Sequence, residues 1–185
     1  SLLSQSRKPD HILFIDDGVG DCLHLPKLYD DVKFVFREEN LGVVASFQSA
    51  LEMVETDKVM FIGADNWLRS DALELLGEVE ADIVTYDIIS TGELKDEIVM
   101  RHPDEIKRWQ GDWYWDRSSG HHGSMLYDTK LGQQVGYMSP PGRTLEDLIL
   151  YEGMLALEAT REHLEEPLLY YRRHLENFYS CLTSE

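Results

Sequence analysis

Carboxylates in this chain occur where apolar, strand-like runs end. Asp16 and Asp17 fall in "FIDDGVGD", and Asp65 follows "KVMFIGA". Adjacent carboxylates repel each other, so they need solvent, a cation or hydrogen-bond donors such as those of a base or ribose. Asp65 and Asn66 offer hard oxygen ligands that suit Mg²⁺ or Mn²⁺ carrying a diphosphate. Structural alternatives stay open: an acidic turn whose glycines serve backbone geometry, and a helix-capping turn at Asp65.

A second set of polar residues lies toward the carboxyl end of the chain. In "TLEDL", Asp147 could act as a general base on an acceptor hydroxyl, or Thr144 and Asp147 could form a capping box. A position at the positive end of a helix would lower the pKa of Asp147 and keep it ionised. In "YYRRH", strand alternation points Arg172 and His174 the same way, where they could hold phosphate and metal. The alternative is a solvated sheet edge that offsets the acidic surface.

The elements that must position these residues follow an alternation of apolar runs and helix-period segments, which is typical of a largely parallel α/β sheet. Ligands of such sheets gather outside the carboxyl ends of the strands, where Asp16, Asp17 and Asp65 fall. The expected strands cover residues 11–16, 32–36, 58–63, 81–89 and 166–174, and the expected helices cover residues 41–55, 69–80 and 143–159.

An aromatic stretch, residues 108–123, interrupts this pattern and is expected to be a long loop. Its aromatic side chains could present flat faces to a sugar ring, or they could fill the core beneath the loop. They are Trp109, Trp113, Tyr114 and Trp115.

Composition limits the classes of protein and partner. A chain of 185 residues with 43% hydrophobic content is long enough for one domain with a substantial core. The net charge of −18 disfavours nucleic acid and anionic membranes as partners. A phosphorylated ligand would therefore need local bases or a divalent cation near it. Alternatively, the acidity could serve only solubility. The two cysteines predict no disulfide framework and a reduced, cytoplasmic protein, and no run reaches the ~20 apolar residues of a membrane span.

Taken together and in order, these stretches resemble the family 2 glycosyltransferases with the GT-A fold. Two early segments are similar to the family's D-D-G-S-x-D and N-L-G runs: Asp16-Asp17-Gly18-Val19-Gly20-Asp21 and Asn40-Leu41-Gly42. Three later ones are similar to its D-A-D-D-W-L run, its E-D pair and its Y-R-x-H ending: Gly63-Ala64-Asp65-Asn66-Trp67-Leu68, Glu146-Asp147 and Tyr171-Arg172-Arg173-His174.

The resemblance implies one GT-A domain over residues 1–185, with a mostly parallel, Rossmann-like central sheet flanked by helices. Residues 1–100 would form the half that binds nucleotide-sugar and metal, and residues 101–185 the half that binds the acceptor. The implied reaction is a metal-dependent, inverting transfer of a sugar from a nucleotide-diphospho-sugar to an acceptor hydroxyl. A UDP-sugar is the commonest donor in the family, and the acceptor would be a glycan, a lipid or a protein.

The resemblance also implies roles for individual residues. Asp147 would be the catalytic base, and Asp65 and His174 would bind Mn²⁺ or Mg²⁺ under the diphosphate. Asp16 and Asp17 would hold the base or ribose. The other substrate-binding candidates are Asn40, Gly42, Ala64, Trp115, His122, Glu146 and Arg172.

The sequence departs from the family pattern at three places. Gly63 stands where the family has the first acid of its D-x-D, and Phe47 and Gln48 replace an Arg-Asn pair. The family's first strand has no counterpart before "SLLSQS", so we expect a chain that extends N-terminally and, without that strand, unpaired edges between residues 11–16 and 58–63. These departures keep two alternatives open: a non-enzymatic or degenerate nucleotide-sugar-binding module, and a metal-dependent nucleotidyl or phosphoryl transferase.

Overall fold

The computed structural model describes residues 1–93, 97–105, 122–143 and 145–174. The strands are β1 (Ile12–Asp16), β2 (Val32–Phe36), β3 (Lys58–Val59), β4 (Trp67–Leu68), β5 (Ile83–Gly92), β6 (Ile98–Met100), β7 (Met125–Asp128) and β8 (Arg161–Arg173). The helices are α1 (Val43–Glu52), α2 (Ala72–Gly77), α4 (Thr129–Val135) and α5 (Glu146–Ala156), with 3₁₀ turns at Leu2–Ser4 and Leu25–Lys27. None of the described helices is both long and apolar enough to cross a membrane.

The strands form two separate sheets. β1 and β2 pair in parallel, with Asp16 opposite Phe36 at their carboxyl ends. The larger sheet has the order β3-β7-β5-β8-β4, and β6 pairs with β5. Among the described residues no ladder joins β1 to β3, so the layer is interrupted where the sequence led us to expect a further strand. That further strand stays a prediction.

The larger sheet is mixed: its longest ladder is parallel, and its short ladders are antiparallel. β5 runs parallel to β8 but antiparallel to β6 and β7. The pairs β3–β7 and β4–β8 are antiparallel as well. The antiparallel partners β4, β6 and β7 come from connections between the expected elements, where runs of two to four residues are too short to show a period.

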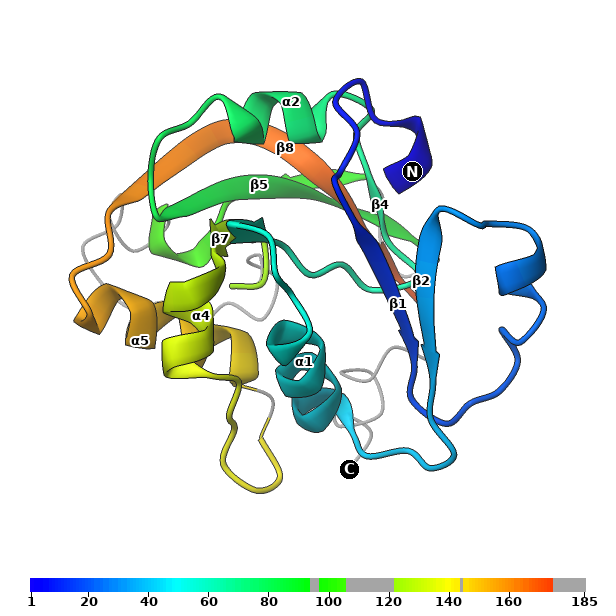
Figure 1. The fold of residues 1–185 in the computed structure, drawn as a ribbon. Helices are drawn as coiled ribbons and strands as arrows, with labels where there is room; N and C mark the ends of the chain where they lie inside the picture. The colour runs from blue at the N-terminus through cyan, green and yellow to red at the C-terminus, as the bar shows by residue number, and fades with distance from the viewer. Residues whose placement is uncertain (94–96, 106–121, 144, 175–185) are drawn as a thin grey trace.

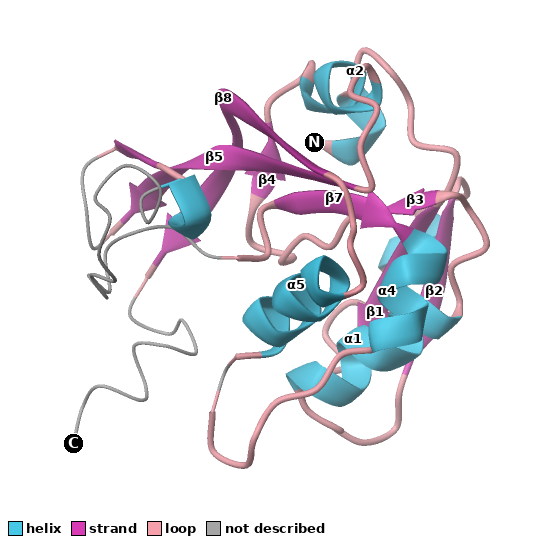
Figure 2. Ribbon diagram, turned by 90° about the vertical axis from the view of Figure 1, so that its left-hand side faces the viewer, coloured by secondary structure: helices cyan, strands magenta, loops and turns pink. Residues whose placement is uncertain are grey.

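Helices cover both faces of the larger sheet. Figures 1 and 2 show α2 on one face and α1, α4 and α5 on the other. Each face has its own apolar core, one around Leu76 and Tyr86 and the other around Leu51, Tyr127 and Leu150. The expected strand 58–63 is hydrogen-bonded only over β3, yet its side chains alternate as a strand's do, with Phe61 and Ile62 packed against opposite cores.

Candidate functional site

Asp16 ends β1 and is buried. Its Oδ1 accepts hydrogen bonds from the amides of Val19 (2.8 Å) and Gly20 (3.2 Å), and its Oδ2 accepts one from Gly20 (3.0 Å). Gly18 in this turn has φ +80°, and a Cβ there would lie 2.6 Å from the backbone nitrogen of Asn40. Asp16 therefore organises its own turn, and its contact with a base or ribose stays a prediction.

Asp17 joins the loop after β1 to the loop after β2. Its Oδ1 accepts from the Leu41 amide (3.1 Å) and the Arg37 guanidinium (3.0 Å), and its Oδ2 accepts from the Gly42 amide (2.9 Å). Burial raises the pKa of the Asp17 carboxyl, but hydrogen bonds from Leu41, Ser46, Arg37 and Gly42 outweigh burial and hold the pKa below its usual value. Asp17 is therefore ionised and fixed at neutral pH.

The start of α1 belongs to the same cluster. Asn40 Oδ1 also accepts from the Gly42 amide (2.9 Å), and Gly42 has φ +85°, a conformation that favours glycine. Arg37 reaches α1 through Ser46 Oγ (2.9 Å) and Ser49 Oγ. Sequence reasoning missed Arg37, although a single cation directly after a strand, beside two acids, is the signal that could have found it.

The strand pair β4–β8 brings the predicted metal ligands together. Its register places Trp67 opposite Tyr170, so the residues before Trp67 lie beside those after Tyr170. His174 Nε2 lies 3.2 Å from Asp65 Oδ2, and both side chains are partly exposed. Asn66 reinforces this approach because its Oδ1 accepts from the Arg172 amide at 2.9 Å.

The helix-capping alternative for Asp65 is wrong. β4 lies between Asp65 and α2, which begins only at Ala72. Asp65 therefore does not cap that helix. Ala64 is exposed in the turn before it, and the Arg172 side chain is exposed at the end of β8.

Gly63 faces the same acid. A Cβ at Gly63 would lie 3.0 Å from Asp65 Oδ1 and 2.7 Å from Asn66 Nδ2. A side chain at this position would therefore point at the Asp65 carboxylate, and the Asn66 amide now occupies that space.

Asp65 and His174 fit a divalent cation as part of a shared site. Mg²⁺ is usually held by one or two carboxylates together with substrate phosphates, and carboxylates suit Mn²⁺ equally. One carboxylate and one imidazole, 3.2 Å apart, leave positions for diphosphate oxygens. The donor set is therefore compatible with the predicted cofactor.

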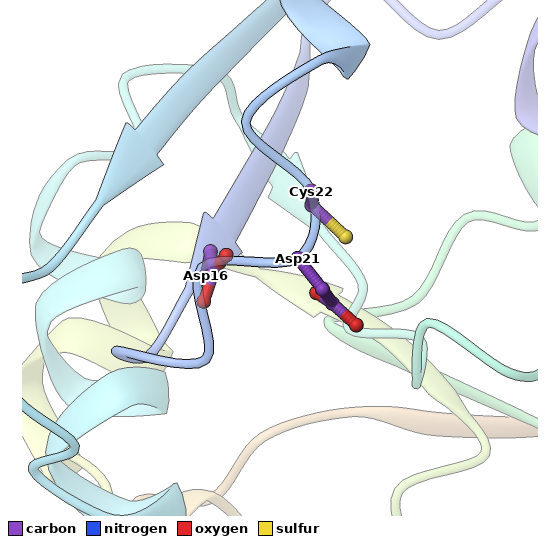
Figure 3. Close-up of side chains that lie close together, drawn as sticks. All are labelled: Asp16, Asp21 and Cys22. Carbon is purple, nitrogen blue, oxygen red and sulfur yellow. The ribbon is translucent and has the colours of Figure 1, made fainter.

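In the described part of the chain, one group of three ligand-type side chains converges. Ligand atoms of Asp16, Asp21 and Cys22 lie within 4.8 Å of one another near the end of β1 (Figure 3). The hydrogen bond with Asp21, then burial and the two negative charges, raise the pKa of the Cys22 thiol. A protonated thiol is a poor ligand for Mg²⁺ or Mn²⁺, and both Asp16 oxygens already accept amide hydrogens. This group therefore does not replace the Asp65–His174 pair.

Asp147 lies in the first turn of α5 and is partly buried. Burial and, to a lesser extent, the charge of Glu146 raise the pKa of the Asp147 carboxyl to about 7. The expectation of a lowered pKa is therefore wrong, because burial outweighs the positive helix end. A carboxylate with such a pKa is a much stronger base than an ordinary one and is still substantially ionised at neutral pH.

The surroundings of Asp147 are polar but buried. Glu146 is 7% exposed, and its Oε2 has no hydrogen-bond partner among the described residues. Burial and the nearby charge of Asp147 raise the pKa values of Tyr86, Tyr127 and Tyr137. The hydroxyls of Tyr127 and Tyr137 lie 3.2 Å apart. These groups stay protonated and can act as hydrogen-bond donors.

Phe47 and Gln48, which depart from the family pattern, connect α1 to this region. Gln48 Oε1 accepts from the Tyr137 amide at 2.7 Å. The Phe47 ring packs against Tyr137 and Phe61, with centroids 5.1 and 5.2 Å apart. α1 thus contacts Tyr137, whose hydroxyl pKa is raised in part by the charge of Asp147.

The His122 ring lies beside Tyr151 of α5, with its centroid 5.9 Å from that of Tyr151 and 5.6 Å from that of His102. The substrate-binding role of His122 stays a prediction. Trp115 and the other aromatic side chains of its stretch lie outside the described residues, as does Thr144 of the proposed capping box.

The fold is that of the GT-A glycosyltransferases. It superposes on the crystal structure of S. aureus TarS 1–349 in complex with UDP-GlcNAc with a TM-score of 0.71 at 15% identity, covering 100% of this chain and 56% of that one. The complex of TarS 1–349 with UDP gives a TM-score of 0.68 at 17% identity, covering 96% of this chain and 56% of that one.

The chain belongs to the glycosyl transferase family 2, whose family model matches residues 1–136. None of the curated proteins matches it significantly in sequence. The chain spans little more than half the length of the TarS structures it resembles.

Proposed function

We propose that this protein transfers a sugar from a nucleotide-diphospho-sugar to an acceptor hydroxyl, with inversion at the anomeric carbon and Asp147 as the general base. The observation that carries the proposal is the raised pKa of Asp147, about 7, at the start of a helix in a family 2 glycosyltransferase fold. Such a carboxylate suits proton abstraction from a hydroxyl at neutral pH.

In this reaction the acceptor oxygen attacks the anomeric carbon from the face opposite the diphosphate. A carbon–oxygen bond to the acceptor forms as the bond to the diphosphate breaks, and the acceptor proton passes to Asp147. Glu146 Oε2, which has no hydrogen-bond partner among the described residues, would accept a hydrogen bond from a substrate hydroxyl. The raised pKa of Asp147 means that the base gains basicity from burial.

The donor would be held by the loops after β1 and β2 and by the Asp65–His174 pair. Asp17 and Arg37 fix the first two loops, and Asn40 and Gly42 shape the entry to α1. A divalent cation, Mn²⁺ or Mg²⁺, bound at Asp65 and His174 would neutralise charge on the departing diphosphate. Arg172 is exposed near this pair and could reach a phosphate oxygen.

A UDP-sugar is the proposed donor, because the GT-A structures that this chain resembles include TarS complexes with UDP and UDP-GlcNAc. The acceptor would be a glycan, a lipid or a protein, bound by the half formed by residues 101–185. The net negative charge disfavours a nucleic-acid partner. The low cysteine content favours a cytoplasmic location.

A second candidate function is a degenerate nucleotide-sugar-binding module, and Gly63 is the observation that favours it. Without the first acid of the metal motif, the chain could bind donor and lack chemistry. A phosphoryl or nucleotidyl transferase would keep the same metal pair but break a bond to phosphorus.

Product analysis tests these functions together. The protein is incubated with UDP-GlcNAc, Mn²⁺ and a panel of hydroxyl acceptors, beside the variant Asp147→Asn. We expect UDP and a transferred or hydrolysed sugar of inverted configuration from the unaltered protein. The variant should keep donor binding while its turnover falls by about 10²- to 10⁴-fold. Release of UMP would favour attack at phosphorus. Donor binding without turnover would favour the binding module, and full activity of the variant would refute the base assignment.

A further inference from the structure

A buried polar network holds α5 at a second point, beyond the base. Tyr151 lies four residues after Asp147, so the two side chains project from the same side of the helix. The Tyr151 side chain is fully buried, and its hydroxyl donates a hydrogen bond to Asp104 Oδ2 at 2.6 Å. Its ring packs against the imidazole of His102 with centroids 5.2 Å apart. α5 is thereby attached to the segment 101–105.

The segment 101–105 is in turn fixed to the central strand. The His102 amide donates to Oδ1 of Asp87, a buried residue of β5, at 3.0 Å. The Asp104 amide donates to His102 Nδ1 at 3.4 Å, which assigns the ring proton to Nε2. Burial, with the charges of His122 and Arg161, lowers the pKa of His102 well below its usual value, so this imidazole is neutral. Tyr151 is therefore connected to β5 through Asp104 and His102.

β8 holds Asp87 from its other side. His163 Nε2 lies 3.3 Å from Asp87 Oδ1, and His163 Nδ1 lies 3.0 Å from Thr85 Oγ1. The Thr85 hydroxyl also accepts a hydrogen bond from Arg161 at 3.4 Å. The approach of His163 Nε2 to Asp87 is a close contact and not a hydrogen bond, so β8 contacts Asp87 through the His163 ring.

Packing alone does not account for such a network. Apolar residues of similar volume often stabilise a core as well as buried charged groups do. The hydrogen bonds from Tyr151 to Asp104 and from the His102 amide to Asp87 instead connect α5, the segment 101–105 and β5 at specific atoms. The start of α5 is not held by a side-chain cap, because its N-cap residue, Leu145, makes no capping hydrogen bond. Tertiary contacts must therefore hold the helix in place. Another close approach is at Gly153, where a Cβ would lie 2.5 Å from Val135 of α4.

We propose that Tyr151 is a positioning residue for the base: through Asp104 and His102 it holds α5, and with it Asp147, in a fixed place relative to β5. This inference rests on the proposed function of Asp147. The ladder between β5 and β8 runs from Ile83 opposite Arg161 to Gly92 opposite Arg173, next to His174, with register shifts on either side of Asp87. The network therefore contacts β5 and β8, the two strands whose ladder ends next to His174 of the Asp65–His174 pair.

A double-mutant cycle on the whole chain tests the connection. Tyr151→Phe keeps the ring and removes the hydroxyl, and Asp104→Ala removes its acceptor. We expect each variant to lower kcat by about 10- to 100-fold with the KM for UDP-GlcNAc unchanged, because the base is misplaced. The double variant should be no slower than the slower single variant, because both break one hydrogen bond. The control Tyr29→Phe, at an exposed tyrosine outside the network, should keep full activity. Unchanged kcat in Tyr151→Phe, or effects that multiply, would overturn the proposal.

A titration that needs no turnover separates this inference from the proposed function. The ¹³C signal of the Asp147 carboxyl is followed against pH in the unaltered protein and in Tyr151→Phe. We expect the midpoint of the variant to move toward the ordinary carboxyl range, because a loosened α5 exposes Asp147 to water. A shifted midpoint in a protein without transferase activity would keep the positioning role and reject the proposed function. An identical midpoint would reject the positioning role whatever the activity.

Discussion

His174 Nε2 lies 3.2 Å from Asp65 Oδ2, although 109 positions separate the two residues in the chain. The antiparallel pair β4–β8 produces this approach, and Asn66 secures it by accepting a hydrogen bond from the Arg172 amide. An imidazole and a carboxylate at the end of a strand pair can share a divalent cation or bond each other directly. The two possibilities differ in how nucleotide binding depends on metal.

Gly63→Asp should strengthen the metal site. A Cβ at this position would lie 3.0 Å from Asp65 Oδ1 and 2.7 Å from Asn66 Nδ2, so the Asn66 amide must shift to admit a side chain. A second carboxylate adds a hard ligand, so we expect tighter Mn²⁺ binding, measured by calorimetry with UDP present. Gly63→Ala is the matched control: it displaces Asn66 in the same way but adds no ligand, so it should bind Mn²⁺ less tightly than Gly63→Asp. Equal affinities for the Asp and Ala variants would show that this position does not face the cation.

Asp17→Ala should destabilise the fold. The substitution leaves Arg37 and the amides of Leu41 and Gly42 without their acceptor, at a cost of about 1–3 kcal/mol in the free energy of unfolding at neutral pH. Because the folded-state pKa of Asp17 lies below its unfolded value of 3.8, this stability is present above pH 3.8 and is lost as pH falls through the folded pKa.

Urea denaturation of Asp17→Ala at several pH values measures the effect. Asp21→Ala removes an exposed acid from the same loop and should change stability by less than about 0.5 kcal/mol. A difference between Asp17→Ala and the unaltered protein that does not shrink in acid would contradict the ionic role of Asp17.

Turnover should rise with pH through the pKa of the base. Asp147 has a pKa of about 7 and must be deprotonated to accept the acceptor proton, so kcat should increase through neutral pH and then level off. Initial rates at saturating donor and acceptor give this profile. A kcat that is already constant from about pH 5 upward would mean that the base is an ordinary carboxylate.

Ionisation of the buried Asp147 carboxyl should also lower the free energy of unfolding. Its folded-state pKa, about 7, lies above the unfolded value of 3.8, so the folded protein binds the proton more tightly and loses stability as pH rises between these values. Asp147→Asn lacks this loss, so it should unfold at a higher temperature than the unaltered protein above neutral pH and show a smaller advantage in acid. Thermal unfolding of both proteins across this range measures it, and an Asn variant that is less stable at high pH would refute the assigned burial.

Long elements could be predicted from the sequence because their periodicity is local. The expected strands 11–16, 32–36, 81–89 and 166–174 correspond to β1, β2, β5 and β8, and the expected helices to α1, α2 and α5 with shorter bounds. β4, β6 and β7 have two to four residues, and such runs carry no detectable period. They are also the strands that make the sheet mixed.

The candidate site was predicted only in part. The family resemblance implied that Asp65 and His174 share a metal site; the two side chains lie 3.2 Å apart, and their binding of a metal stays a prediction. The raised pKa of Asp147 could not be foreseen, because burial at a helix start depends on residues distant in the chain. The hydrogen bond from Tyr151 to Asp104 spans 47 positions and has no local signature.

Calorimetric titration of UDP, with and without Mn²⁺, tests the donor site most directly. We predict that the unaltered protein binds UDP tightly only with Mn²⁺. Asp65→Ala and His174→Ala should each lose about tenfold or more in affinity, as is typical when a metal site is disturbed. Glu162→Ala, at an exposed acid on β8, should bind like the unaltered protein. Affinity for UDP that is independent of Mn²⁺ and unchanged in Asp65→Ala would contradict a metal-assisted donor site at this pair.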